Sequence, residues 1–402
     1  MIVRSVPSWL ILMLHFFESV NCFLSSPPSR QRISSSSIVI TSYPPSKSNK
    51  STLSSSKLAA AAREEEEVKR LLIFGNGNVA NEIGNYVSEA NDGTFDTIFS
   101  TYRNSNGSNS PPSSNNKVEF IHFDHASDFI SECTHVLITI PPSIQNSSSF
   151  NFDDPVSDDL ELMRSIPKNV TIGYVSTTGV YGNHNNSFVN EASPILCKLG
   201  TKAFAYREIE KRWQQLQTRH DDADDDDANA SNRNIFIFRC AGLYGNNFSA
   251  LHTVRNRGIP KPELKPEPES TRPMAMMDEG YTSRVHLKDV ARAIVATMKR
   301  TDLKGGGIYN LSDSAPAPRS QVMNYAKELL SQSNVSTDGR ETGDIVVAGS
   351  ERRKRRNKDR KRVSNDAMKE MLRDEGGLLY PTYREGLQEV LANNIDQWKA
   401  MG

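Results

Sequence analysis

The chain of 402 residues is long enough for one large α/β domain or two smaller domains. Its 48 acidic and 48 basic side chains give a formal net charge of zero, which argues neither for nor against a nucleic-acid partner. Cys133, Cys197 and Cys240 remain after the N-terminal presequence, an odd number without metal-like spacing. We therefore expect reduced, structural cysteines rather than a metal site.

The first 63 residues are predicted to be a targeting sequence rather than part of the fold. Arg4 precedes an apolar run at 9–17, and small residues follow near position 22, which predicts a signal peptide over 1–22. Residues 23–63 are rich in Ser, contain Lys and Arg and lack Asp and Glu, which is typical of a transit peptide. Together they resemble the bipartite presequences of algae with complex plastids. This resemblance implies the chloroplast stroma as destination, with secretion as the alternative. The apolar run is too short, and too polar at Glu18, to favour a membrane span, so no membrane is expected for the mature chain.

Apolar runs then alternate with helical periodicity. The run 68–74 ends at Gly75, and Val79, Ile83 and Val87 recur at helical spacing, which predicts strand, turn and helix. The further strands are predicted at 94–102, 118–123, 135–140, 170–175 and 234–239, with a long helix from 201 to about 217. This alternation predicts an α/β Rossmann fold with a doubly wound parallel sheet over 68–250.

Two segments interrupt this domain, a Ser/Asn-rich tract near 104–116 and an Asp-rich tract near 220–233, and both are predicted to be disordered insertions. Residues 251–400 are predicted to form a smaller C-terminal substrate-binding part that is interleaved with the Rossmann core. The basic run 352–362 has no interleaved aromatic residue, so we expect an exposed loop rather than a nucleic-acid site.

The sequence Gly-x-Gly-x-x-Ala between the first strand and its helix predicts a dinucleotide-binding loop. Gly75 permits the tight turn, and Gly77 lets the backbone approach a pyrophosphate. Ala80 keeps the helix close to the strand, and the amides of Asn78, Val79 and Ala80 are expected to hold the anion.

Residues after the second, third and fourth strands are expected to choose the cofactor. Arg103 could pair with a 2′-phosphate while Thr101 donates a hydroxyl, which favours NADP over NAD; a surface arginine is the alternative. Asp124 is expected either at the adenine edge or as the cap of the following helix. Pro141 is a further expected cofactor contact.

Several motifs in order resemble the extended short-chain dehydrogenase/reductase superfamily, the NAD-dependent epimerase/dehydratase group. The resemblance runs from about residue 69 to 396, and some segments are similar to an atypical subgroup found in bacteria and plastid-bearing organisms. The superfamily motifs are at 75–80, 176–182, 239–245 and 284–290, and the subgroup motifs are at 137–142, 361–365 and 380–386.

The resemblance implies where the catalytic groups lie. Thr177 matches the catalytic Ser/Thr, and Thr178 is a neighbouring candidate for substrate contact. The family's Tyr-x-x-x-Lys is absent, because Lys202 occupies the Tyr position and Tyr206 the Lys position.

Three interpretations of this exchange are open. Lys202 and Tyr206 are four apart on a helix and could form a swapped pair in which Lys202 lowers the pKa of the Tyr206 phenol. Alternatively, Tyr181 or a group of the substrate donates the proton. In the third interpretation Tyr206 is a packed aromatic residue, Lys202 is a surface residue, and the site binds NADP without turnover.

The same resemblance suggests roles in the C-terminal half. Arg284 matches an arginine that grips an anionic substrate, and Arg239 precedes a loop that closes over nicotinamide and substrate. His286 is expected to be a packed histidine and Asp289 a helix cap.

Together these features predict an NADP-dependent atypical reductase or epimerase that acts on a hydroxyl or carbonyl of a small or sugar-like substrate. The alternative is a non-catalytic NADP-binding scaffold or redox sensor. A small-molecule substrate is the expected partner, and the oligomeric state is open.

Overall fold

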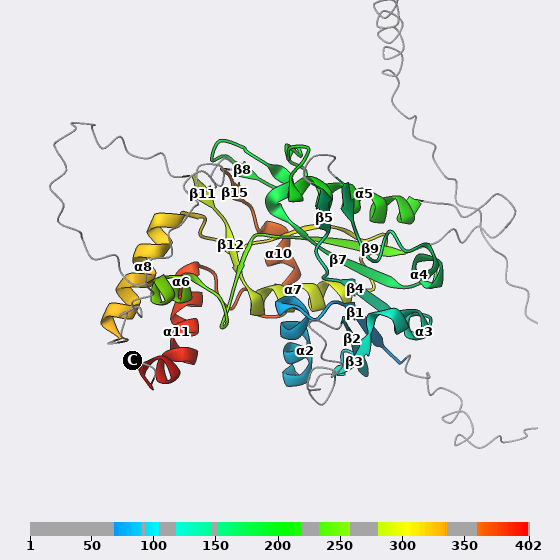
Figure 1. Cartoon of the computed structure of the whole chain (residues 1–402), viewed down its shortest axis with the longest axis horizontal. Coiled ribbons are helices and arrows are strands. Elements are labelled where there is room, and N and C mark those ends of the chain that lie inside the picture. The colour runs from blue at the N-terminus through cyan, green and yellow to red at the C-terminus, as the bar shows by residue number, and fades with distance from the viewer. Residues whose placement is uncertain are drawn as a thin grey trace, which may run out of the picture. The chain divides into compact units, whose positions relative to one another are not determined.

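Seven parallel strands form the central sheet, in the order β13-β9-β7-β4-β1-β2-β3 (Figure 1). The strand order reverses between β1 and β4, which is where a doubly wound sheet opens a crevice for a ligand. The predicted fold class is confirmed. The strands are β1 Arg70–Phe74, β2 Thr97–Tyr102, β3 Val118–His122, β4 His135–Ile138, β7 Thr171–Thr177, β9 Asn234–Cys240 and β13 Gly307–Leu311.

This computed structural model describes residues 68–90, 93–103, 118–146, 151–218, 233–257, 280–333, 335 and 360–400, all within one unit, Glu66–Gly402. The predicted signal and transit peptides, the insertion 104–116, nearly all of 220–233 and most of the basic run lie outside the described residues.

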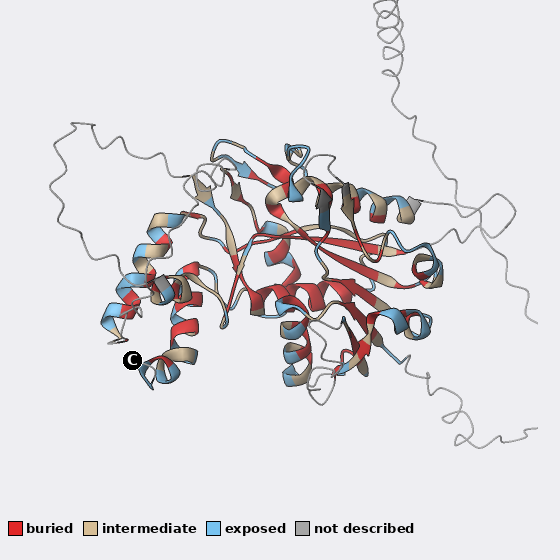
Figure 2. Ribbon diagram, viewed as in Figure 1, coloured by how far each residue is buried: buried red, intermediate tan, exposed pale blue. Residues whose placement is uncertain are grey.

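The near-continuous apolar runs of the sequence become strands that are buried on both faces. Figure 2 shows the middle of the sheet as its most buried part. Residues Leu72, Ile73 and Phe74 of β1 have no exposed surface, and Ile172 and Tyr174 of β7 have none either. A parallel sheet needs such runs because helices cover both of its sides.

Two layers of helices cover the sheet. On one face α2 and α7 pack with α10, and their buried side chains form the first core cluster together with Ile73 and Val175. On the other face α3, α4 and α5 contribute Ile130, Leu162 and Trp213 to the second cluster. The helices are α2 Asn78–Ala90, α7 Leu287–Met298, α10 Asp366–Met371, α3 Ala126–Ile130, α4 Leu160–Ser165 and α5 Lys202–Thr218.

The C-terminal part has a core of its own, the third cluster, built by α6, α8 and α11. It is interleaved with the Rossmann core, because α7 and β13 return to the central sheet between α6 and α8. Its helices are α6 Ala250–Arg257, α8 Arg319–Gln332 and α11 Tyr383–Ala400. Small paired strands complete the fold: β5 Ser143–Asn146 with β6 Asn151–Asp153, β8 Phe188–Val189 with β15 Arg362–Val363, β10 Gly242–Tyr244 with β12 Arg284–His286, and β11 Tyr281–Thr282 with β14 Ala317–Pro318. Among the helices of the described ranges, none has both the length and the apolar character that a membrane crossing requires.

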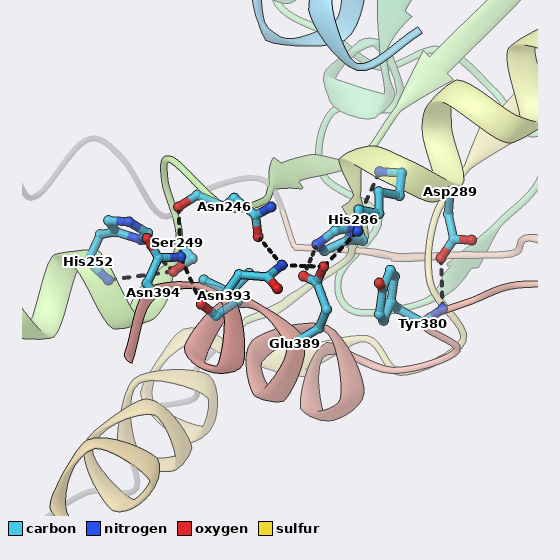
Figure 3. A network of polar contacts seen from close by, with 11 residues as sticks. Asn246, Ser249, His252, His286, Asp289, Tyr380, Glu389, Asn393 and Asn394 are labelled. Atoms are coloured by element: carbon cyan, nitrogen blue, oxygen red, sulfur yellow. Dashed lines mark hydrogen bonds and ion pairs between the residues drawn. The ribbon is translucent and has the colours of Figure 1, made fainter. Parts of the chain in front are cut away.

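Polar contacts tie α11 to the start of α7 (Figure 3). Glu389 on α11 accepts a hydrogen bond of 2.8 Å from the Lys288 ammonium, and its second oxygen lies 3.4 Å from Nε2 of the buried His286. Asn393 donates to the same carboxylate over 2.6 Å. Burial alone would raise the pKa of Glu389, but hydrogen bonds from His286 and Lys288 lower it to about 2.

The sequence suggested that Asp289 caps a helix, but Asp289 does not cap α7. His286 is the cap residue, since its Nδ1 accepts the amide of Lys288 over 3.2 Å. The Asp289 carboxylate instead accepts the amides of Leu379 and Tyr380 over 2.8 and 2.9 Å and so anchors the segment that leads into α11 (Figure 3).

We predict that Glu389→Gln destabilises the protein at neutral pH by about 1–3 kcal/mol. A carboxyl group whose pKa is lower in the folded than in the unfolded protein stabilises the fold when it is ionised, and glutamine cannot ionise. The folded pKa of Glu389 lies below its unfolded value, so this contribution is present above the unfolded pKa. It is lost as pH falls toward about 2. Urea unfolding between pH 7 and pH 3 measures the difference.

The matched control is Glu370→Gln on α10, since its carboxylate is exposed and pairs with Arg373 at the surface. It should change stability by less than about 0.5 kcal/mol. A Glu389→Gln deficit that stays constant from pH 7 to pH 3 would contradict the assignment.

Candidate functional site

Hydrogen bonds from the end of β2 hold the turn between β1 and α2 in place. Gly75 has a φ of 111°, and a Cβ there would lie 2.6 Å from Oγ1 of Thr139, so only glycine fits. Its amide donates to Oγ1 of Thr101 over 2.9 Å, and the Ser100 hydroxyl donates to its carbonyl over 2.9 Å. The turn is therefore rigid before any ligand binds.

The space above Gly77 is open. A Cβ on Gly77 would meet no atom within 4 Å, and the residue is exposed. The amide of Asn81 donates to the Gly77 carbonyl over 3.0 Å, which makes Gly77 the first capping residue of α2. The amides of Asn78, Val79 and Ala80 consequently have no carbonyl partner within the helix. These amides form a cradle, and backbone amides without a partner at a helix start are the donors that a pyrophosphate site requires.

The Thr101 side chain does not point into the open space at the cradle. It is 1% exposed and supports the Gly75 turn, so the expected contact of its hydroxyl with a 2′-phosphate is wrong. Arg103 is exposed at the carboxyl end of β2, where its guanidinium stacks 4.0 Å from the centroid of the Phe123 ring. Of the two expected groups, only the arginine remains available to a phosphate.

Asp124 follows β3 on the same side of the sheet. It is exposed and lies 3.5 Å from Nδ1 of His122. Its carboxylate caps no helix, because His122 caps the turn and the cap position of α3 has no side-chain hydrogen bond. Apart from its contact with His122, the Asp124 carboxylate is exposed at this end of the sheet. Pro141, just beyond β4, is also exposed.

Thr177 ends β7 on the carboxyl edge of the sheet. Its Oγ1 accepts the Gly179 amide over 3.0 Å and so begins the 3-10 turn Thr178–Tyr181. A Cβ placed on Gly179 would lie 3.2 Å from this oxygen and 3.4 Å from Cβ of Ala203, so the start of α5 lies next to Thr177. Thr178 is 7% exposed and faces the protein, which does not support its expected substrate contact.

Lys202 and Tyr206 do not form the swapped pair that the sequence suggested. Lys202 is exposed at the first position of α5, and its ammonium lies 5.9 Å from the centroid of the Tyr206 ring, over the face of the ring. Burial raises the pKa of Tyr206 to about 12, with Cys240 and Asp154 adding to the effect. The phenol is thus a weaker acid than usual, which is the opposite of the proposed activation.

Tyr181 is not the alternative proton donor. Its side chain is fully buried, and its hydroxyl donates to Oδ1 of Asn310 over 2.8 Å and accepts from Arg239 over 3.0 Å. Burial raises the pKa of Tyr181, although the Arg239 guanidinium opposes this. The phenol belongs to the framework of the site and is not available to a substrate.

A buried ion pair lies at the centre of that framework. Glu210 of α5 accepts from Nε and Nη2 of Arg239 on β9, with the shortest contact at 2.7 Å, and both side chains are at most 5% exposed. The Ser176 hydroxyl donates to Glu210 over 2.5 Å. We did not predict this pairing, although a charged residue within a strand that is otherwise apolar, as Arg239 is, indicates a buried partner.

Arg284 is held by neutral acceptors. Its guanidinium donates to the carbonyls of Thr282 and Ala317 over 3.0 and 3.2 Å, and no carboxylate of the described residues lies within ion-pair distance. Burial lowers the pKa of Arg284, opposed by the Asp313 carboxylate. The arginine is fixed in place with its charge not neutralised by an ion pair. His286 is packed, as predicted, with its ring 4.2 Å from that of Tyr380.

A cavity of about 390 Å³ lies beside the segment that joins Thr177 to α5. Its walls come from three parts of the chain and carry mostly amide, hydroxyl and charged groups, and none of the predicted catalytic side chains lines it. Its lining residues include Phe188, Asn190, Ser193, Asn365 and Asp366. The described residues contain no group of three or more potential metal ligands.

No protein-family model matches the sequence, and no match is found among curated proteins. Solved structures do match. A conserved protein of unknown function from Silicibacter pomeroyi aligns with a TM-score of 0.55 and 24% identity, over 81% of this chain and 99% of that chain. The UDP-glucuronic acid 4-epimerase of Bacillus cereus, in complex with NAD, aligns with a TM-score of 0.52 and 12% identity, over 79% and 94%.

A third match is a double mutant of the dTDP-glucose 4,6-dehydratase from Streptomyces venezuelae with NAD bound, at a TM-score of 0.51 and 13% identity, over 83% of this chain and all of that chain. The chain has the fold of the extended short-chain dehydrogenases and reductases. The fold that the motifs implied is therefore confirmed, and in this fold Gly75–Ala80 and Thr177 lie at the same edge of the sheet.

We predict that Glu210→Gln destabilises the protein by about 3 kcal/mol or more, because it leaves the Arg239 guanidinium buried without a counter-charge. The control is Glu208→Gln on the same helix, whose carboxylate pairs with Arg207 and Lys211 nearer the surface. That change should cost less than about 1 kcal/mol. Guanidinium chloride unfolding of both variants measures this, and equal losses would show that the buried pair does not support the fold.

Proposed function

We propose that this protein is an NADP-dependent atypical reductase or epimerase that acts on a hydroxyl or carbonyl of a small, sugar-like substrate. The observation that carries the proposal is the open cradle above Gly77 together with the Thr177 hydroxyl at the same sheet edge. A bound nicotinamide cofactor would supply hydride transfer at this edge. The N-terminal 63 residues would direct the protein to the plastid.

The preference for NADP rests on Arg103. Its guanidinium is exposed at the end of β2 and held against the Phe123 ring, so it is positioned without being neutralised. Pairing with a 2′-phosphate would use its two parallel N–H groups. The Asp124 carboxylate lies 3.5 Å from Nδ1 of His122 and is exposed, so it would be accessible to the adenine end of the cofactor.

Lys202 is the group best placed to replace the missing tyrosine. It occupies the first position of α5, next to Ala203 and hence close to Thr177, and its side chain is exposed. During reduction of a carbonyl, Thr177 would donate a hydrogen bond to the substrate oxygen. The Lys202 ammonium would then give its proton to that oxygen as carbon accepts the hydride.

The substrate class is supported by polar surroundings. The cavity near Phe188 offers amide, hydroxyl and carboxylate groups from Asn190, Ser193 and Asp366, which suits a ligand rich in hydroxyl groups. The charge of Arg284 would favour an anionic substituent on it. Two of the similar solved structures are named for enzymes of nucleotide sugars, which supports a sugar-like substrate here.

A non-catalytic NADP-binding scaffold or redox sensor is the second candidate. It is favoured by the burial of the Tyr181 hydroxyl and by the raised pKa of Tyr206, since neither phenol is activated. The two candidates differ in turnover and not in cofactor binding.

The first test is binding of NADPH to a processed protein of residues 64–402. We expect the fluorescence of NADPH to change on binding, with a dissociation constant in the micromolar range. Gly77→Asp should abolish this, because its carboxylate would occupy and repel the pyrophosphate position, while aspartate remains a good capping residue. Loss of NADPH binding with an unchanged melting temperature supports the cradle, and wild-type protein that fails to bind NADPH sinks both candidates.

The second test is Arg103→Ala. Losing a charged hydrogen bond to a phosphate should weaken NADPH binding by about 10-fold or more, whereas NADH binding should change by less than about 2-fold. Arg164→Ala on α4 is a charge-matched control outside the cradle. Equal losses for both cofactors with Arg103→Ala would remove the 2′-phosphate assignment.

A further inference from the structure

A second cavity, of about 350 Å³, lies on the face of the molecule where α2 and α7 pack against each other. The segment Leu379–Tyr380, which leads into α11, closes its third side. Glu82, Tyr86 and Glu89 follow helical spacing and present one face of α2 to the cavity. Lys288 and Arg292, four residues apart, line it from α7. The proposed function uses none of these residues.

The two cations of this cavity are already engaged. Lys288 donates to Glu389 over 2.8 Å. Arg292 donates to the carbonyls of Gly377 and Glu375 over 2.7 and 2.5 Å and lies 3.3 Å from Asp289. Each positive charge thus has a carboxylate partner outside the cavity.

The two acids are not engaged in this way. Glu82 and Glu89 form no ion pair with any residue in the part of the chain that the structure describes. Burial raises the pKa of Glu82, with Glu89 and Glu389 adding to it against Lys288 and His286. With Glu389 and Asp289, the partners of the two cations, four carboxylates face two cations around this cavity, so its surroundings carry an excess of negative charge.

Aromatic rings complete the lining. Tyr86 comes from α2, and Tyr380 is fixed by its ring, whose centroid lies 4.2 Å from that of His286, and by its backbone amide, which donates a hydrogen bond to Asp289 (Figure 3). Leu379 is 51% exposed and forms an apolar rim. Carboxylates beside tyrosine rings are the groups that bind organic cations, because a ring face attracts a cation while the carboxylate pairs with it.

We infer that the cavity between α2, α7 and Tyr380 is a second ligand site, which binds an alkylammonium or alkylguanidinium group. The charge of the ligand lies between Glu82 and Glu89, and its alkyl stem lies against Tyr86, Tyr380 and Leu379. A free amine or the side chain of a basic residue on another protein supplies this chemistry equally well. Inorganic cations lack the stem that the tyrosine rings and the leucine would contact.

Titration calorimetry and thermal shift with the purified protein test this site. The probes are agmatine, putrescine, its uncharged analogue 1,4-butanediol, and the blocked peptide acetyl-Gly-Arg-Gly-amide. We expect at least one cationic probe to bind and to raise the melting temperature, and 1,4-butanediol to do neither. Glu82→Gln combined with Glu89→Gln should weaken binding by about 10-fold or more, since charged hydrogen bonds are lost.

Tyr380→Leu should weaken binding by about 3- to 5-fold, the loss of a partly exposed cation–π contact. Glu119→Gln on β3 is the matched control, because Glu119 is an exposed carboxylate that does not line the cavity and alternates to the strand face opposite Val118, the residue that packs on α2; it should leave binding unchanged. Binding of the amines alone assigns the site to a small molecule, and binding of the peptide alone assigns it to a protein partner. Both results support the site.

The inference is overturned if no cationic probe binds at 10 mM, if 1,4-butanediol binds as well as putrescine, or if the double glutamine variant binds as the wild type does. Glu89 is exposed, Glu82 is only partly buried, and glutamine keeps the size of both side chains, so the variants should fold, and circular dichroism checks this. NADPH binding is measured on the same samples. Its retention in the double variant separates this site from the cofactor cradle.

Discussion

The buried pair of Glu210 and Arg239 is the interaction on which the active edge of the sheet depends. It joins α5 to β9, and through Ser176 and Tyr181 it also reaches β7 and the turn after Thr177. A buried guanidinium requires a counter-charge in a fixed position, so α5 cannot slide along the sheet without losing the pair. The positions of Thr177 and Lys202 relative to each other follow from this constraint.

The same pair determines which charges remain for a ligand. Inside the framework Arg239 is neutralised by Glu210, and at the start of α7 Lys288 is neutralised by Glu389. Arg103, Lys202 and Arg284 have no carboxylate partner within ion-pair distance among the described residues and lie at strand ends, a helix start or a paired strand. Three cations without an ion-pair partner are suited to a phosphorylated cofactor and an anionic substrate, which agrees with the proposed function.

The backbone could be predicted from the sequence much better than the side-chain partners. The strands of the central sheet and the Gly75 turn were predicted because apolar runs and glycines report on local conformation. Thr101, Tyr181 and Asp289 were misassigned because their partners, Gly75, Arg239 and Tyr380, are distant in sequence. Motif position says which edge of the sheet a residue occupies, and three-dimensional contacts decide whether its polar atoms are already used.

With Lys202 in the place of the family's tyrosine, the proposed proton donor is a cation rather than a neutral phenol. Reduction of a carbonyl would need one proton at the substrate oxygen, and a lysine ammonium that gave up its proton would leave a neutral amine and no anion. A phenol of pKa about 12, as Tyr206 has, would have to become an anion in a largely buried position, which burial opposes. The electrostatics therefore favour Lys202 over Tyr206 as the group that moves the proton.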